Sequence, residues 1–150
     1  MKPEETWVRD ELAELARSDR GRQLLQLSLR GIGRGERKVT AGCWTDRGVA
    51  GCLFQHAYWQ GVEEGMFADR GRPGDWIGSF VGTGDYGQVI RTIEAFDTLA
   101  RRHYSDVTRR RILPDRVEVR HDDWRIVVES MLVDTLAESA PASEEVVASA

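Results

Sequence analysis

The residues whose chemistry stands out first are a cysteine and a histidine four positions apart, Cys52 and His56. On a helix this spacing places a thiol and an imidazole on adjacent turns of one face. With Cys43 they could bind zinc, whose usual ligands are thiolate sulfur and imidazole nitrogen. The same pair could act as nucleophile and base, because a neighbouring imidazole lowers the pKa of a thiol. The alternative is a buried cysteine beside a buried, hydrogen-bonded histidine that does no chemistry.

Aromatic residues are frequent around this pair. The 150 residues include five tryptophans, at positions 7, 44, 59, 76 and 124. Large aromatic side chains are core-formers first, so we favour the interpretation that they anchor the core. In the alternative, Tyr58 and Trp59 contact a small ligand or cofactor in a pocket around this helix. That pocket would be completed by Cys43, Cys52, His56 and His103.

A glycine-rich segment precedes a predicted helix. Residues 82–87, Gly-Thr-Gly-Asp-Tyr-Gly, match the pattern Gly-x-Gly-x-x-Gly. In dinucleotide-binding folds such glycines let the backbone approach a pyrophosphate at a helix N-terminus. The rest of the sequence lacks the alternating strands and helices of that fold, and Asp85 puts an anion where phosphate would sit. We therefore favour a loop that leads into a helix capped by Asp85 and Gln88.

A third pattern, Arg116-x-x-x-x-His121, lies before the last predicted helix. This spacing resembles the catalytic motif of HEPN-type ribonucleases, which are small all-α dimers. The resemblance covers six residues and implies that the arginine and histidine converge on a scissile phosphate, as electrostatic stabiliser and acid/base. The nearby run Arg109, Arg110 and Arg111 could contact nucleic-acid phosphates, although a solvated basic surface is the favoured interpretation.

Composition restricts the class of protein. The net charge of −4 argues against nonspecific nucleic-acid binding, which normally needs a basic surface. Two cysteines are too few for a disulfide framework, and no apolar run is long enough to span a membrane. The N-terminus lacks a signal-peptide core, so we expect a cytoplasmic protein. Arginine outnumbers lysine 19 to two, which is typical of a GC-rich genome and suggests a bacterial source.

Apolar residues at helical spacing predict a mostly all-α chain with about five helices and a short extended piece near Lys38. Three of the predicted helices cover residues 3–17, residues 19–32, and residues from 46 to either 61 or 65. The other two begin near positions 85 and 122. Asp19 is expected to cap the second helix. The third helix is expected to bury Val49, Cys52 and His56 on one face, and the fourth to bury His103. We expect one compact bundle over residues 1–138 and a disordered tail over 139–150.

These observations predict a non-catalytic interaction or regulatory protein that binds a protein partner or a second copy of itself. The first alternative is a metal- or small-ligand-binding protein that uses Cys52 and His56. The second alternative is a HEPN-like ribonuclease that uses Arg116 and His121. The favoured hypothesis needs no cofactor, whereas the metal hypothesis would use zinc.

Overall fold

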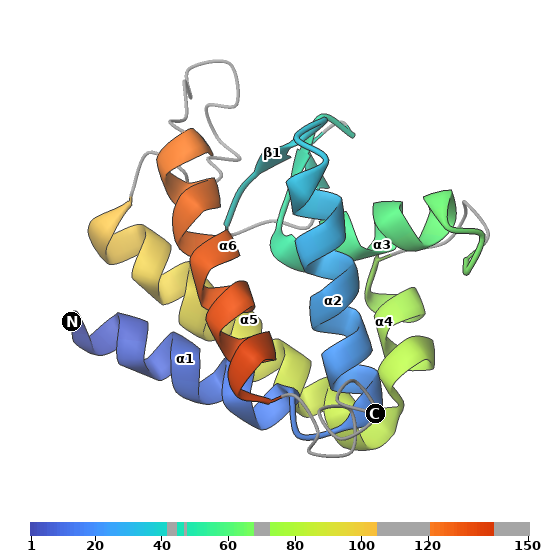
Figure 1. Cartoon of the computed structure of the whole chain (residues 1–150), viewed down its shortest axis with the longest axis horizontal. Coiled ribbons are helices and arrows are strands. Elements are labelled where there is room, and N and C mark those ends of the chain that lie inside the picture. Colours follow the sequence, from blue (N-terminus) through green and yellow to red (C-terminus); the bar gives the residue numbers. More distant parts are fainter. Residues whose placement is uncertain (42–44, 47, 68–72, 105–120, 140–150) are drawn as a thin grey trace, which may run out of the picture.

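The computed structural model describes residues 1–41, 45, 46, 48–67, 73–104 and 121–139, and these residues are mostly helical (Figure 1). The described residues form six helices: α1 (Pro3–Leu15), α2 (Asp19–Gly33), α3 (Leu53–Glu63), α4 (Pro73–Val81), α5 (Thr83–His103) and α6 (His121–Glu138). Three two-residue strands accompany them: β1 (Lys38–Val39), β2 (Thr45–Asp46) and β3 (Ala50–Gly51). The prediction of a mostly all-α fold with a short extended piece is therefore confirmed.

Two helix pairs build the core. Helix α2 packs on α3, α1 packs on α5, and α6 lies against both α2 and α1 (Figure 1). The apolar stripes predicted from sequence meet between these helices, where Leu12, Leu24, Leu99, Trp124 and Leu132 are all but inaccessible to solvent. None of the described helices combines the length and the apolarity that crossing a bilayer requires.

The α2–α3 contact is close because α2 carries a glycine where it crosses α3. A Cβ atom added at Gly31 would lie 2.4 Å from the backbone oxygen of His56. A side chain at this position would push the two helices apart. Gly31 therefore sets the distance between the C-terminal half of α2 and the first turns of α3.

The small sheet holds the start of α3 in place. Its strand order is β1-β3-β2, with β1 parallel and β2 antiparallel to β3. The amide of Lys38 donates to the carbonyl of Val49 at 3.0 Å, and the amide of Thr40 donates to the carbonyl of Gly51 at 2.8 Å. These bonds fix the segment after α2 against the segment that leads into α3.

This sheet overturns the predicted start of the third helix. Helix α3 begins at Leu53, Cys52 is its N-cap residue, and Val49 lies in a turn with 63% of its surface exposed. Gly48 adopts a φ of +73°, which a helix does not allow, and Ala50 and Gly51 pair in the sheet. Strand pairing and the glycine turn therefore replace the first helical turn expected near Asp46.

Two predicted helix caps are also wrong. Ser18, not Asp19, caps α2, because its Oγ accepts a hydrogen bond from the amide of Gly21 at 2.9 Å. Helix α5 begins at Thr83, after Gly82 turns the chain out of α4 with a φ of +84°. Asp85 therefore lies within the first turn and caps nothing, and the remaining glycines of the 82–87 pattern are helical. A helix precedes this pattern, where a dinucleotide-binding fold requires a strand.

The predicted burial of His103 is wrong too. This residue ends α5 on an exposed surface, where its Nε2 lies 2.9 Å from a carboxylate oxygen of Glu4. Arg102 donates to the other oxygen at 2.7 Å. Figure 1 places this end of α5 on the opposite side of the molecule from α3. His103 therefore belongs to an ion-pair cluster between α1 and α5. The predicted C-terminal tail lies outside the described residues, apart from Ser139.

Candidate functional site

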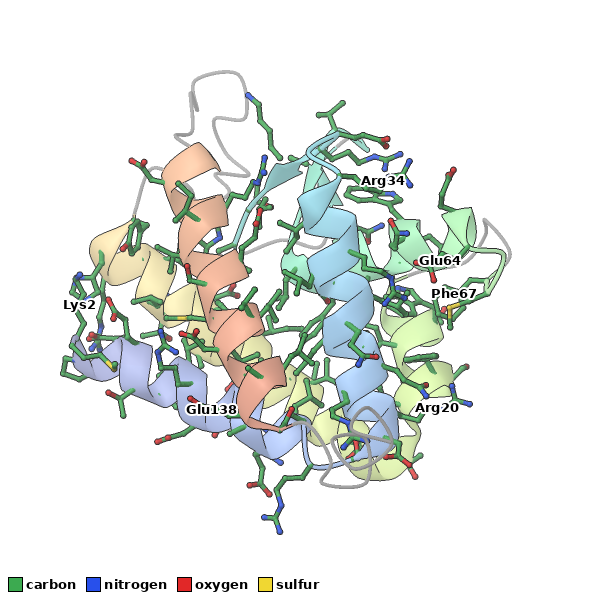
Figure 2. All side chains as sticks on the ribbon, in the orientation of Figure 1. Lys2, Arg20, Arg34, Glu64, Phe67 and Glu138 are labelled. Atoms are coloured by element: carbon green, nitrogen blue, oxygen red, sulfur yellow. The ribbon has the colours of Figure 1, made fainter. Side chains whose placement is uncertain are left out.

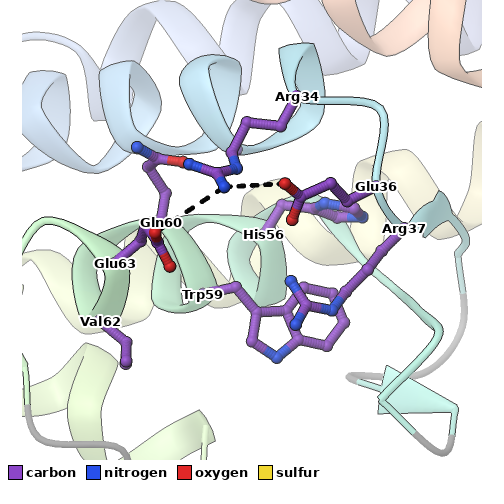
Figure 3. Close-up of a pocket in the computed structure, with 9 residues that line it drawn as sticks. Arg34, Glu36, Arg37, His56, Trp59, Gln60, Val62 and Glu63 are labelled. Carbon is purple, nitrogen blue, oxygen red and sulfur yellow. Dashed lines mark hydrogen bonds and ion pairs between the residues drawn. The ribbon is translucent and has the colours of Figure 1, made fainter.

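A polar pocket opens between the C-terminal end of α2 and the outer face of α3. Its volume is about 240 Å³. Figure 3 shows the side chains that surround it. Its lining consists of Gly31, Arg34, Glu36, Arg37, His56, Trp59, Gln60, Val62 and Glu63. Since α2, the segment before β1 and α3 all contribute, the pocket exists only once these elements have packed.

The polar pocket is lined by equal numbers of positively and negatively charged side chains. Arg34 donates to Glu36 at 2.8 Å and lies 3.9 Å from Glu63 (Figure 3). This pairing raises the pKa of Arg34 and lowers the pKa of Glu36. Arg37 donates to the carbonyl of Gly48 at 3.0 Å, and its guanidinium carbon lies 4.3 Å from the ring centre of Trp59. Two cations and two anions therefore line one small cavity.

His56 forms part of the wall of the polar pocket and is only 2% exposed. Its Nε2 lies 3.0 Å from the carbonyl oxygen of Lys38, which can only accept, so Nε2 carries the hydrogen and donates it. Burial lowers the pKa of His56 to about 4. The ring meets Trp59 edge-on at 5.2 Å. His56 is therefore neutral at neutral pH, and hydrogen bonds with the backbone of Lys38 and of Gly51 hold its ring in place.

Gln60 lines the polar pocket and carries a buried hydrogen-bond acceptor that has no partner among the described residues. Its amide nitrogen donates to Glu64 at 2.7 Å, and Arg30 holds that carboxylate at 2.9 and 3.0 Å. Because the carboxylate only accepts, the amide must turn its nitrogen towards Glu64. The carbonyl oxygen Oε1 is then left buried, with no partner among the described residues. A buried acceptor without a partner costs roughly 1–3 kcal/mol, so Oε1 is suited to a donor from a bound molecule.

The candidates predicted along helix three are divided among three cavities. His56 and Trp59 line the polar pocket, whereas Tyr58 lines a larger groove on another side of α3. Cys52, which is 6% exposed, lines a small cavity beside Trp124. Successive residues of a helix point about 100° apart. The single pocket containing all these side chains, expected from their closeness in sequence, is therefore not formed.

The remaining predicted site residues lie mostly outside the described part of the chain. They are Cys43, Arg109, Arg110, Arg111 and Arg116. His121 is the first residue of α6, and its side chain is not described. Within the described ranges, no three histidine, cysteine, aspartate or glutamate side chains lie together as a metal site requires. The zinc and ribonuclease hypotheses stay predictions.

Sequence reasoning missed four residues of the polar pocket: Arg34, Glu36, Arg37 and Gln60. The first three follow α2 in a charged segment that reads as a solvated loop. Gln60 is separated from them by more than 20 residues, so their meeting depends on the α2–α3 contact. The signal in the sequence was Gly31, a helical glycine, which often marks a close approach between helices.

Comparison with known proteins found no matching family model, no matching curated protein and no matching solved structure. Inference about function therefore depends on the geometry of the pockets and surfaces described above.

Proposed function

We propose that this chain is a non-catalytic binding protein whose ligand is a small polar molecule held in the polar pocket. The observation that carries the proposal is the buried carbonyl oxygen of Gln60, which has no hydrogen-bond partner in the part of the chain that the structure describes. It belongs to a side chain that is only 8% exposed and that Glu64 holds in one orientation. An acceptor fixed in this way discriminates between ligands, because only a ligand with a donor satisfies it.

The charges around the polar pocket favour a ligand that carries both signs. Arg34, Arg37, Glu36 and Glu63 all line the same volume of about 240 Å³, so a ligand with one net charge would be repelled by one pair. A free amino acid fits this arrangement: its ammonium group would donate to Gln60 Oε1, and its carboxylate would accept from Arg37. Such charge-assisted bonds are the strong ones in proteins.

His56 supports binding rather than catalysis at this site. A general base works best with a pKa near the operating pH. The pKa of His56 is about 4, and its Nε2 hydrogen is used by the Lys38 carbonyl. The imidazole therefore acts as a rigid, neutral wall of the pocket.

The proposal is tested by thermal unfolding of the full chain with each of the twenty free L-amino acids, followed by calorimetric titration of those that stabilise it. A ligand at ten times its Kd adds about 1.4 kcal/mol, which raises Tm by roughly 3–5 °C in a domain of this size. Gln60→Met should weaken binding about tenfold. Gln26→Met, an exposed glutamine on α2, is the matched control and should bind normally. If none of the twenty raises Tm, the proposal is wrong.

A second candidate function is self-association, and the outer face of α6 favours it. Ile126 and Val133 are 63% and 51% exposed there, seven residues apart, while the opposite face of α6 is buried. The exposed Ser130 and Ala137 continue the stripe with small side chains that let another helix approach closely. An antiparallel second copy centred between Ser130 and Val133 would also place Arg125 opposite the partner's Glu138.

Self-association is tested by sedimentation at increasing protein concentration. Val133→Glu should shift the protein to a monomer, because it buries a charge in the contact. Val49→Glu alters another exposed valine, which lies in the turn before β3 and not on α6, and should leave the dimer intact. A wild-type protein that stays monomeric at roughly 100 μM, where even weak interfaces associate, would contradict this second candidate.

For either function we propose a bacterial cytoplasmic setting. The support is compositional: two cysteines, too few for a disulfide framework, and 19 arginines against two lysines.

A further inference from the structure

A second cavity, the aromatic groove, lies on another side of α3. It is formed by the start of α2, the end of α3 and helix α4. Its volume is about 510 Å³, and its lining consists of Arg20, Tyr58, Met66, Phe67, Trp76, Ser79 and Phe80. Figure 2 shows Arg20 and Phe67 on the side of the molecule where α4 lies. No residue lines both this groove and the polar pocket.

Four aromatic rings form one continuous wall of the aromatic groove. Phe67 lies at the centre, with its ring centre 6.1 Å from Tyr58, 5.0 Å from Trp76 and 5.5 Å from Phe80. At the rim, the flexible side chain of Met66 is 46% exposed. A wall of this kind binds flat apolar groups, because ring contacts add to the benefit of removing apolar surface from water.

Two residues that line the aromatic groove, Arg20 and Trp76, carry hydrogen-bond donors. The guanidinium carbon of Arg20 lies 4.9 Å from the ring centre of Phe80, and Arg20 donates to the uncharged Gln23 at 3.1 Å. Across the described ranges, no ion pair includes Arg20. The indole nitrogen of Trp76, a residue only 9% exposed, is buried without a described acceptor. Indole N–H groups and guanidinium groups donate and never accept.

We propose that the aromatic groove binds a small aromatic carboxylate. The ring of the ligand lies against Phe67, Trp76 and Phe80, and its carboxylate accepts hydrogen bonds from Arg20 and from the indole N–H. This arrangement gives the arginine a counter-charge, and it gives an acceptor to the indole donor, which has none among the described residues. A cationic ligand of the same shape would meet the guanidinium as a like charge and leave the indole donor unsatisfied.

Calorimetric titration of the full chain with 2-naphthoate tests this proposal, with 2-naphthylmethylammonium as the probe of opposite charge. The carboxylate should bind about tenfold more tightly than the ammonium compound. Arg20→Gln should remove most of this preference, whereas Arg101→Gln, an exposed arginine on α5, should keep it. Trp76→Phe keeps a ring but removes the N–H, and should weaken binding of 2-naphthoate severalfold.

Thermal unfolding of each variant identifies any that fails to fold. The proposal is overturned if folded wild-type protein binds no 2-naphthoate at millimolar concentration. It is equally overturned if both probes bind alike, or if Arg20→Gln leaves the charge preference unchanged. Because the two cavities share no lining residue, Gln60→Met should not affect 2-naphthoate binding, so this result is separable from the amino-acid proposal.

Discussion

His56 should make the folded state less stable as the pH falls from 7.5 to 5. In the unfolded chain this imidazole titrates near its ordinary pKa of 6.5, whereas burial lowers its pKa to about 4 in the folded chain. Between these values the unfolded state binds a proton that the folded state does not, so acid favours unfolding. The stabilising contribution is complete above pH 6.5 and is lost as the pH falls towards 4.

The size of this effect follows from the two pKa values. Their full difference corresponds to about 3 kcal/mol, since each pKa unit is worth about 1.4 kcal/mol. At pH 5 the unfolded histidine is almost fully protonated and the folded one is mostly neutral, which gives a loss of about 2 kcal/mol relative to pH 7.5. Acidic residues with lowered pKa values, such as Glu4 at about 2, lose their contribution at more acidic pH.

Urea unfolding at several pH values between 7.5 and 5 measures this loss directly. The matched variant is His56→Gln, whose amide can still donate to the Lys38 carbonyl but does not titrate. It should have lower stability at neutral pH and a much flatter dependence on pH. His103→Gln should retain the acid-induced loss, because this variant leaves the buried imidazole of His56 in place. If His56→Gln loses stability with acid as steeply as the wild type, burial of His56 does not control the pH dependence.

Two further predictions concern helix contacts. Gly31→Ala should destabilise the fold by roughly 1–3 kcal/mol in urea unfolding, since its Cβ would lie 2.4 Å from the His56 carbonyl oxygen. The control is Gly33→Ala, whose added Cβ would have no atom within 4 Å and should stabilise α2 by about 0.5–1 kcal/mol. If Gly31→Ala leaves the stability unchanged, the close approach of α2 and α3 is contradicted. Arg102→Gln should raise the pKa of Glu4 from about 2 towards 4.5, because the Arg102 hydrogen bond lowers it most. Carbon NMR of the Glu4 carboxyl during a pH titration measures this, and an unchanged pKa would refute the assignment.

The comparison of predicted and observed elements shows where local sequence signals stopped being sufficient. The helix beginning at Pro3 and the last helix were predicted close to their observed bounds, because the helical spacing of apolar residues is a local signal. The start of α3 was misplaced because Ala50 and Gly51 pair with strands from other segments. Asp85 resembled a helix cap, yet Gly82 already turns the chain three residues earlier. Non-local pairing and backbone conformation outweighed local patterns at these positions.

The sequence by itself determined that the chain is mostly helical, which faces of most helices are buried, and that α3 carries residues of interest. Each of these depends on the 3.6-residue period and on side-chain hydrophobicity, which act over a few turns. Only the tertiary structure decided which of those residues share a cavity. The close approach at Gly31 brings Arg34 and Glu36 to Gln60, and the rotation between successive residues sends Tyr58 and Trp59 into separate cavities.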